Sequence, residues 1–308
     1  MILKPSPQAP LSCIRMMELI EGILPPGVLN MLTGGLACGE ALTAHPLIPV
    51  VGLVGSVPAG RAVARAAADR LKHVNLELGG KNALIVYPDA DLDRAVEGAL
   101  KGMNFTWCGQ SCGSTSRLFL HESVYDEVLE KVLTGIQHYK PGIPTEMATT
   151  MGAIISKAQL DKIQAYVGIG ASEAKLVYGG RSPQDDRLAN GFYVEPTVFT
   201  GVTMDMRIAR EEVFGPLLSV FKWTDEETML DEVNAVDYGL TASIYTTGLA
   251  NAHHAASRVE VGYVWVNNAG PHFLGVPFGG YKMSGVGREE SLAELLSFTQ
   301  TKNINIAL

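Results

Sequence analysis

Short apolar runs alternate with amphipathic helical segments along most of the chain, and this alternation restricts the fold more than any other feature. The run Val50–Val54, for example, reads as a buried strand that turns at Gly55-Ser56 into an alanine-rich helix expected over 57–71. Repeated strand–helix units form parallel sheets covered by helices, with sites at the carboxyl ends of the strands. The sequence therefore predicts an α/β fold.

The same patterns predict the remaining elements, and turn residues divide them. The acids at 89–93 are expected to begin a helix and to cap it, because they complement the helix dipole. Further strands are expected over 28–32, 74–78, 83–87, 116–121, 217–221, 242–245, 263–267 and 299–308. Further helices are expected over 12–23, 39–44, 124–136, 156–174, 225–234, 249–259 and 289–296.

Length and composition limit the class of protein. The 308 residues, 47% of them hydrophobic, suggest about two domains on a prior of roughly 150 residues each. A formal net charge of −8 without a Lys/Arg cluster argues against nucleic-acid and anionic-membrane partners. No apolar run approaches the roughly 20 residues of a membrane span, and residues 1–5 have neither the charged n-region nor the long apolar h-region that is typical of a signal peptide. We expect a cytoplasmic protein in a reducing compartment.

The four cysteines have neither metal-site spacing nor the density of a disulfide framework, so no metal site is expected. Three of them read as packing residues, namely Cys13, Cys38 and Cys108. The fourth, Cys112, has small or polar neighbours in Gly-Gln-Ser-Cys-Gly at 109–113. A reactive cysteine needs such a turn, with backbone N–H groups and a nearby base, to reach its thiolate form.

Glu77 is the candidate base for that cysteine. It lies near the end of the alternating run 74–78, and Gly79-Gly80 then ends the strand, so its carboxylate can face a cleft. Each residue also has a structural interpretation, because free cysteines are often buried and strand-end glutamates are usually solvated. The flanking glycines favour function, since they cost conformational entropy. Spacing alone does not bring Glu77 and Cys112 together.

These residues carry a resemblance to a known family. Leu-Glu-Leu-Gly-Gly-Lys at 76–81, followed by Gly-Gln-Ser-Cys at 109–112, resembles the signature pair of the aldehyde dehydrogenase superfamily. Three more segments resemble family motifs in the family's order, and the resemblance covers essentially the whole chain. They are Lys-Pro-Ser at 4–6, Glu-Glu-Val-Phe-Gly-Pro at 211–216 and Pro-Phe-Gly-Gly-Tyr-Lys-Met-Ser-Gly at 277–285.

The resemblance implies an aldehyde dehydrogenase-like fold with an incomplete Rossmann-type cofactor domain and an α/β catalytic domain. We expect a partial cofactor domain over 1–78, a catalytic domain over 79–266, and a return to the cofactor side over 267–308 that ends in an oligomerisation strand. In the family, roughly the first third of the protein precedes Lys-Pro-Ser, so we expect this chain to lack it. Homo-oligomers are expected for the full-length form.

The resemblance also implies the chemistry. Cys112 would attack a small-molecule aldehyde, the thiohemiacetal would pass a hydride to a nicotinamide, and Glu77 would activate water to hydrolyse the thioester. The presence of Glu77 favours release of a free acid over transfer to coenzyme A. The side-chain amide that completes the family's oxyanion hole belongs to the missing third, which leaves the backbone N–H of Cys112.

Cofactor contacts follow from the same motifs. Glu212 matches the glutamate that binds the nicotinamide ribose, Phe214 lies beside the nicotinamide ring, and Lys4 matches the lysine near the adenosine ribose. NAD is the expected cofactor, and NADP is possible, because Pro7 replaces an acid that would accept from the ribose 2′-hydroxyl. The other expected cofactor-binding residues are Gly55, Ser56, Gly60, Leu78 and Gly79.

Five residues are expected around the substrate. Trp107, Ser111 and Gly113 surround the nucleophile motif, and His272 and Phe273 belong to the segment 269–273 that the resemblance places at the aldehyde tunnel. The aromatic side chains favour an apolar or aromatic aldehyde, with His272 as a wall residue.

Three functions therefore stay open at this point. The first is hydrolytic aldehyde oxidation in the full-length form. The second is a catalytically impaired fragment that associates with a full-length paralogue. The third is an acylating or semialdehyde dehydrogenase.

Overall fold

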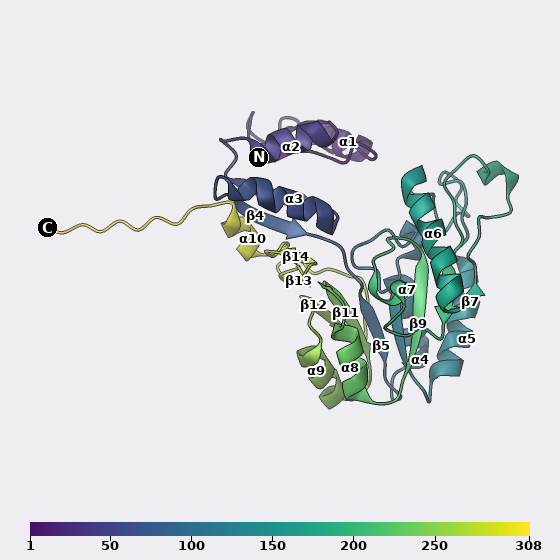
Figure 1. The fold of residues 1–308 in the computed structure, drawn as a ribbon. Coiled ribbons are helices and arrows are strands. Elements are labelled where there is room, and N and C mark those ends of the chain that lie inside the picture. The colour runs from purple at the N-terminus through teal and green to yellow at the C-terminus, as the bar shows by residue number, and fades with distance from the viewer.

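A computed structural model describes residues 1–308 and contains two main sheets with their covering helices (Figure 1). The larger sheet has seven strands, and all its neighbouring pairs are parallel except the antiparallel pair at the β7 edge. In spatial order the strands are β12 (Tyr263–Val266), β11 (Thr241–Tyr245), β5 (Ala83–Val86), β6 (Arg117–His121), β9 (Leu217–Trp223), β8 (Thr197–Thr200) and β7 (Lys175–Tyr178).

Helices cover both faces of this sheet. Successive strand residues point to opposite sides, and since these residues are apolar on both sides, each face has to be buried. Ala83 and Ile85 face one core, together with Ile163 of α6 (Lys157–Glu173). Leu84 and Val86 face the other core. The first core also receives α7 (Arg207–Arg210), α8 (Glu226–Asn234) and α9 (Leu249–Arg258), and the second receives α4 (Leu92–Gly102) and α5 (Tyr125–Gly135).

The smaller sheet has three strands and lies beside the N-terminal helices (Figure 1). Its order is β14 (Gly285–Val286), β4 (His73–Glu77) and β3 (Val50–Val54). Along the chain, α1 (Leu11–Leu19) and α2 (Leu36–Ala44) precede β3, and α3 (Val57–Ala68) connects β3 to β4. The helix α10 (Leu292–Ser297) follows β14. Two short ladders complete the fold, β1 (Ile2–Leu3) with β2 (Asn30–Met31) and β10 (Tyr238–Gly239) with β13 (Tyr281–Lys282).

Most predicted elements are present, with ends that differ by a few residues. Asp91 caps α4 by accepting from the backbone N–H of Arg94, which confirms the capping role of this acidic segment. Cys108 is buried, as expected of a packing residue, whereas Cys13 and Cys38 are only half-buried.

One expectation about burial was wrong, and one expected strand does not form within a single copy of the chain. Val50–Val54 is not buried, because β3 has a strand neighbour on one side only, and Val54 is 69% exposed. Residues 299–308 form no strand and leave the body as an exposed tail (Figure 1). A strand needs a partner for its N–H and C=O groups, and no strand of this chain lies beside the tail. The alternating polarity of 299–308 does not show whether a neighbouring strand is present.

None of the helices is both long and apolar enough to span a bilayer.

Candidate active site

Glu77 is the last residue of β4, and its neighbour across the antiparallel ladder is Gly285 of β14. Its side chain is 3% exposed, and neither carboxylate oxygen has a hydrogen-bond partner. Burial disfavours the ionised form, and the negative charge of Glu289 adds to this, so the pKa of Glu77 rises to about 8. A carboxyl group that titrates near neutral pH is suited to general base catalysis.

Cys112 lies in a tight loop between the short 3-10 helix η1 (Phe105–Trp107) and β6. Gly109 makes this loop possible, because its φ of +64° is left-handed and a Cβ there would lie 2.3 Å from the carbonyl oxygen of Gly215. The half-buried Cys112 packs against a small cluster made by Leu240, Tyr263, Trp265 and Phe278. The nucleophile candidate is thus held in a defined place.

The electrostatic surroundings of Cys112 connect it to Glu77. Burial raises the pKa of the Cys112 thiol to about 11, and the negative charges of Glu77 and Glu212 contribute to the shift. Gly80 joins these groups in space, because it follows Glu77 closely in the chain, donates to Oε1 of Glu212 at 2.9 Å, and would place a Cβ 2.6 Å from the carbonyl oxygen of Cys112. Because the thiol is the resting form at neutral pH, attack on a carbonyl carbon requires a base to remove its proton.

Glu212 lies against the turn that follows β4. Its Oε1 accepts a hydrogen bond of 2.9 Å from the backbone N–H of Gly80, and a Cβ on Gly79 would lie 2.3 Å from its Oε2. Burial raises the pKa of this carboxyl. Phe214 has a left-handed φ of +57°, and its carbonyl oxygen accepts from Nε2 of Gln159 at 2.8 Å. The segment 211–216 is therefore fixed over the glycine turn.

Gly55 and Ser56 occupy the exposed start of α3. Ser56 caps the helix, since its Oγ accepts from the backbone N–H of Ala59 at 3.4 Å. Gly60 serves close packing, because a Cβ there would lie 2.6 Å from Cδ1 of the buried Leu78. The first two residues thus lie where a ligand could reach them, and the other two hold the helix against the strand.

Lys4 is engaged within the N-terminal segment. Its Nζ donates to the carbonyl oxygens of Pro5 at 2.9 Å and Gly34 at 3.0 Å. A ligand that used this ammonium group would share it with these two carbonyls.

The residues expected around the substrate differ in their surroundings. His272 stacks on Phe278 with ring centroids 4.2 Å apart, and its Nδ1 lies 2.7 Å from Oε1 of Glu290. Phe273 lines a groove of about 400 Å³ along β12. Trp107 is 64% exposed and does not line that groove. Next to Cys112, the Ser111 Oγ accepts from the backbone N–H of Gly113 at 3.3 Å.

Several residues of the site escaped the sequence analysis. Glu289 raises the pKa of Glu77, and its position four residues after the glycine-rich motif at 277–285 was the signal that the sequence offered. Lys81 is buried, and its pKa falls to about 7 through desolvation and the nearby Arg117. Asn82 donates from Nδ2 to the carbonyl oxygens of Cys112 and Ser114. No sequence pattern distinguishes this asparagine from a surface residue.

No three His, Cys, Asp or Glu side chains lie close enough together to hold a metal ion.

The raised pKa of Glu77 leads to a stability prediction. As pH rises from about 4.5 to about 8, the unfolded chain loses this proton first, so the group's contribution to the free energy of unfolding falls across that window. The variant Glu77→Gln cannot titrate. It should exceed wild type in the free energy of unfolding by about 2–4 kcal/mol at pH 8 and match it near pH 4.

Urea denaturation at both pH values measures this difference. Glu97→Gln is the matched control, because Glu97 is an exposed glutamate paired with Lys101 on α4. An equal difference between wild type and Glu77→Gln at pH 4 and pH 8 would contradict the assignment.

The amino-acid sequence is similar to those of known aldehyde dehydrogenases. A model described as the aldehyde dehydrogenase family matches residues 1–304. The aldehyde dehydrogenase tropH of Talaromyces stipitatus is 51% identical over 312 aligned residues, which cover 100% of this chain and 61% of that protein. A betaine aldehyde dehydrogenase of Rhizobium etli is 43% identical and is covered over 63% of its length. The chain thus spans about three fifths of the length of these relatives.

Solved structures agree with the fold. The NAD⁺ complex of an aldehyde dehydrogenase from Bacillus cereus superposes with a TM-score of 0.93 at 36% identity, covering 97% of this chain and 60% of that one. A betaine aldehyde dehydrogenase from Staphylococcus aureus, also an NAD⁺ complex, gives 0.92 at 34% identity, with 96% and 59% covered. The predicted fold class is therefore confirmed, and the chain belongs to the aldehyde dehydrogenase family.

Proposed function

We propose that this polypeptide carries the reacting groups for oxidation of an aldehyde to a carboxylic acid, with Cys112 as nucleophile and Glu77 as general base. One observation carries the proposal. Glu77 is a buried carboxyl group without a hydrogen-bond partner, and its charge acts on the thiol of Cys112. An unpaired buried acid is costly to maintain, and such groups occur mainly where their proton affinity is used.

The residues act in two stages. In the first, Glu77, directly or through water, takes the thiol proton, and the Cys112 sulfur bonds to the aldehyde carbon. The backbone N–H of Cys112 can donate to the resulting oxygen. Glu77 then passes the thiol proton to solvent and is a base again. In the second stage, it takes a proton from water as the water oxygen attacks the thioester carbon, and the Cys112 sulfur leaves and is reprotonated as the acid is released. NAD bound beside Glu212 and Phe214 would supply the hydride acceptor that this oxidation requires between the two stages.

The surroundings of the site fit a dinucleotide. At the exposed start of α3, the N–H of Gly55 donates to the carbonyl oxygen of Glu77 at 2.9 Å, so the backbone N–H groups of Ser56 and Val57 are the ones offered to a diphosphate. Glu212 stands half-buried over the Gly79-Gly80 turn, where its carboxylate can accept from ribose hydroxyls. We assign Phe214 to the nicotinamide side and Lys4 to the adenosine side. The side chain of Pro7 carries no carboxylate to repel a 2′-phosphate, so some tolerance of NADP is expected.

The domain division, the substrate and the assembly belong to the same proposal. Residues 1–78 and 267–308 would form the cofactor side and 79–266 the catalytic side. The aromatic groove beside β12 favours an apolar or aromatic aldehyde. The exposed tail at 299–308 would pair with a second copy in a homo-oligomer.

The test is reduction of NAD or NADP by the purified chain with aliphatic, aromatic and betaine aldehydes, with and without coenzyme A. Cofactor reduction without coenzyme A supports hydrolytic oxidation. A strict requirement for coenzyme A would replace hydrolysis with acyl transfer. Absence of reduction, together with capture of a full-length paralogue, would favour the non-catalytic alternative.

A further inference from the structure

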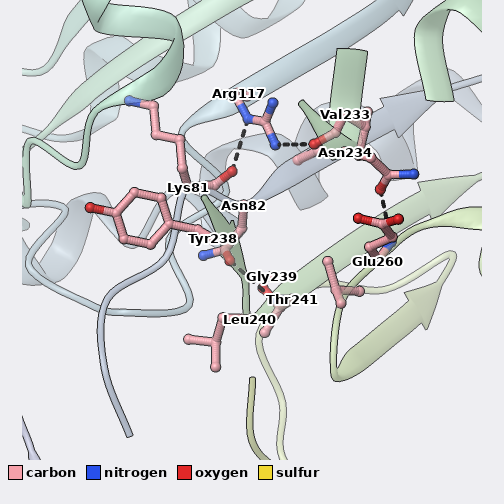
Figure 2. A pocket seen from close by; sticks show the side chains of 12 residues that line it. Lys81, Asn82, Arg117, Val233, Asn234, Tyr238, Gly239, Leu240, Thr241 and Glu260 are labelled. Carbon is pink, nitrogen blue, oxygen red and sulfur yellow. Dashed lines mark hydrogen bonds between the residues drawn. The ribbon is translucent and has the colours of Figure 1, made fainter. Parts of the chain in front are cut away.

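Asn82 lies between the glycine turn and β5 and is 3% exposed. Its Nδ2 donates to the carbonyl oxygen of Cys112 at 2.7 Å and to that of Ser114 at 3.0 Å. Its Oδ1 accepts from the backbone N–H of Thr241, the first residue of β11, at 3.0 Å. Figure 2 shows Asn82 and Thr241 beside each other at the cavity that they both line. The amide therefore joins the nucleophile loop to the large sheet.

The backbone of Asn82 is itself anchored by Arg117. The fully buried guanidinium donates from Nε to the carbonyl oxygen of Lys81 at 2.8 Å and from Nη2 to that of Val233 at 2.8 Å, as Figure 2 shows. The backbone N–H of Arg117 donates to the carbonyl oxygen of Asn82 at 3.1 Å. Val233 lies in the last turn of α8, where carbonyl groups lack helical partners. Asn82 thus projects from a rigid base.

Little space surrounds the amide. A Cβ on Gly80 would lie 2.6 Å from the carbonyl oxygen of Cys112 and 2.6 Å from Oδ1 of Asn82. The adjoining cavity measures about 10 Å³, which is room for one water molecule at most. Asn82 therefore cannot rotate to other partners while the loop keeps its place.

We propose that Asn82 is the positioning residue of the nucleophile: its side-chain amide fixes the main chain at 112–114 and so sets the direction of the Cys112 thiol and backbone N–H. This rests on the proposed role of Cys112 as nucleophile. Buried carbonyl groups that lose their donor pay a desolvation cost, so removal of the amide should release the loop toward water.

Release of the loop has two opposite consequences. The Cys112 thiol becomes better hydrated, so its pKa falls from about 11 toward its ordinary value and it alkylates faster at pH 8. Acylation by substrate becomes slower, because attack on a carbonyl carbon depends on the orientation of the sulfur. A residue that served only global stability would not separate these two rates.

The variants Asn82→Ser and Asn82→Leu test the proposal. Both remain uncharged, and Leu keeps the branched shape of Asn in a larger side chain while removing all three hydrogen bonds. Ser243→Ala is the matched site control, since its buried hydroxyl on β11 has no hydrogen-bond partner. Val128→Ala on α5 is the control for loss of stability alone, because Val128 lies in the core that α4 and α5 form with the large sheet.

Alkylation by iodoacetamide is followed as a function of pH at the Cys112 peptide by mass spectrometry, with Cys13 in the same sample as the internal standard. We expect about tenfold faster alkylation at pH 8 in Asn82→Leu, which corresponds to a fall of about one pKa unit, with a smaller effect in Asn82→Ser. Both controls should match wild type. Unchanged alkylation profiles in both Asn82 variants would overturn the proposal, whatever the chain's activity with aldehydes.

A measurement on the unaltered chain covers the case in which neither variant folds. The backbone amide of Ser114, which donates to the carbonyl oxygen of Ser111 at 3.1 Å, should exchange hydrogen slowly, because Asn82 holds this part of the loop against the sheet. Exchange as fast as in the exposed turn at 145–148 would equally overturn the positioning role.

Discussion

Replacing Cys112 with alanine should abolish both aldehyde-dependent reduction of NAD and acylation by an activated ester such as p-nitrophenyl acetate. The expected loss is about 10⁴-fold or more, because no other group in the site can form the covalent bond to the carbonyl carbon. The ester assay does not need the cofactor. It therefore tests the sulfur even if the aldehyde reaction requires residues outside this chain.

Cys108→Ala is the matched control for this loss. Cys108 lies four residues earlier in the same loop, but it is buried and its Sγ donates to the carbonyl oxygen of Gly152 at 3.2 Å. Burial also raises the pKa of this thiol to about 12. Its removal should leave acylation within a few-fold of wild type. Equal loss of acylation in the two variants would show that the loop, and not the Cys112 sulfur, determines the reaction.

Replacing Glu77 with glutamine should slow hydrolysis of the acyl-enzyme by about 10²–10⁴-fold, because the amide cannot take a proton from water. Acylation should persist at high pH, where hydroxide can remove the thiol proton. In wild type, hydrolysis should rise with pH as Glu77 loses its proton and level off above pH 8 or so, since its pKa is about 8. The variant should lack this rise.

Glu289→Gln distinguishes the base from the charge that tunes it. Because the negative charge of Glu289 raises the pKa of Glu77, its removal should move the pH profile of hydrolysis to lower pH and retain the plateau. A plateau reduced as strongly as in Glu77→Gln would assign proton transfer to Glu289 instead. Rates are read from release of p-nitrophenolate in the steady state.

The repeated strand–helix pattern was sufficient to predict the α/β class and nearly all the helices, but it missed β7 and β8 of the large sheet and several two-residue strands. The pattern predicts which residues face a core, and Ala83 to Val86 alternate between the two cores in this way. It failed where the outcome depended on a neighbour. Burial of Val50–Val54 and a strand at 299–308 both require a partner on a given side, and local polarity contains no information about that partner.

The site was less accessible to prediction than the fold. Motif resemblance selected Glu77 and Cys112, but it could not reveal that both oxygens of Glu77 lack partners or that burial raises the pKa of both groups. Those properties arise from packing between segments distant in sequence. The same reason hides Asn82, whose three hydrogen-bond partners lie 30 to 159 residues away along the chain.

The central claim is that Cys112 forms the acyl-enzyme and Glu77 is the base for its hydrolysis. The most direct test follows the mass of the Glu77→Gln variant after mixing with p-nitrophenyl acetate. The account predicts one acetyl group, located at Cys112 by peptide mapping, that persists long after the wild-type adduct has been hydrolysed. An acetyl group on another residue, or one lost from Cys112 as fast as in wild type, would contradict it.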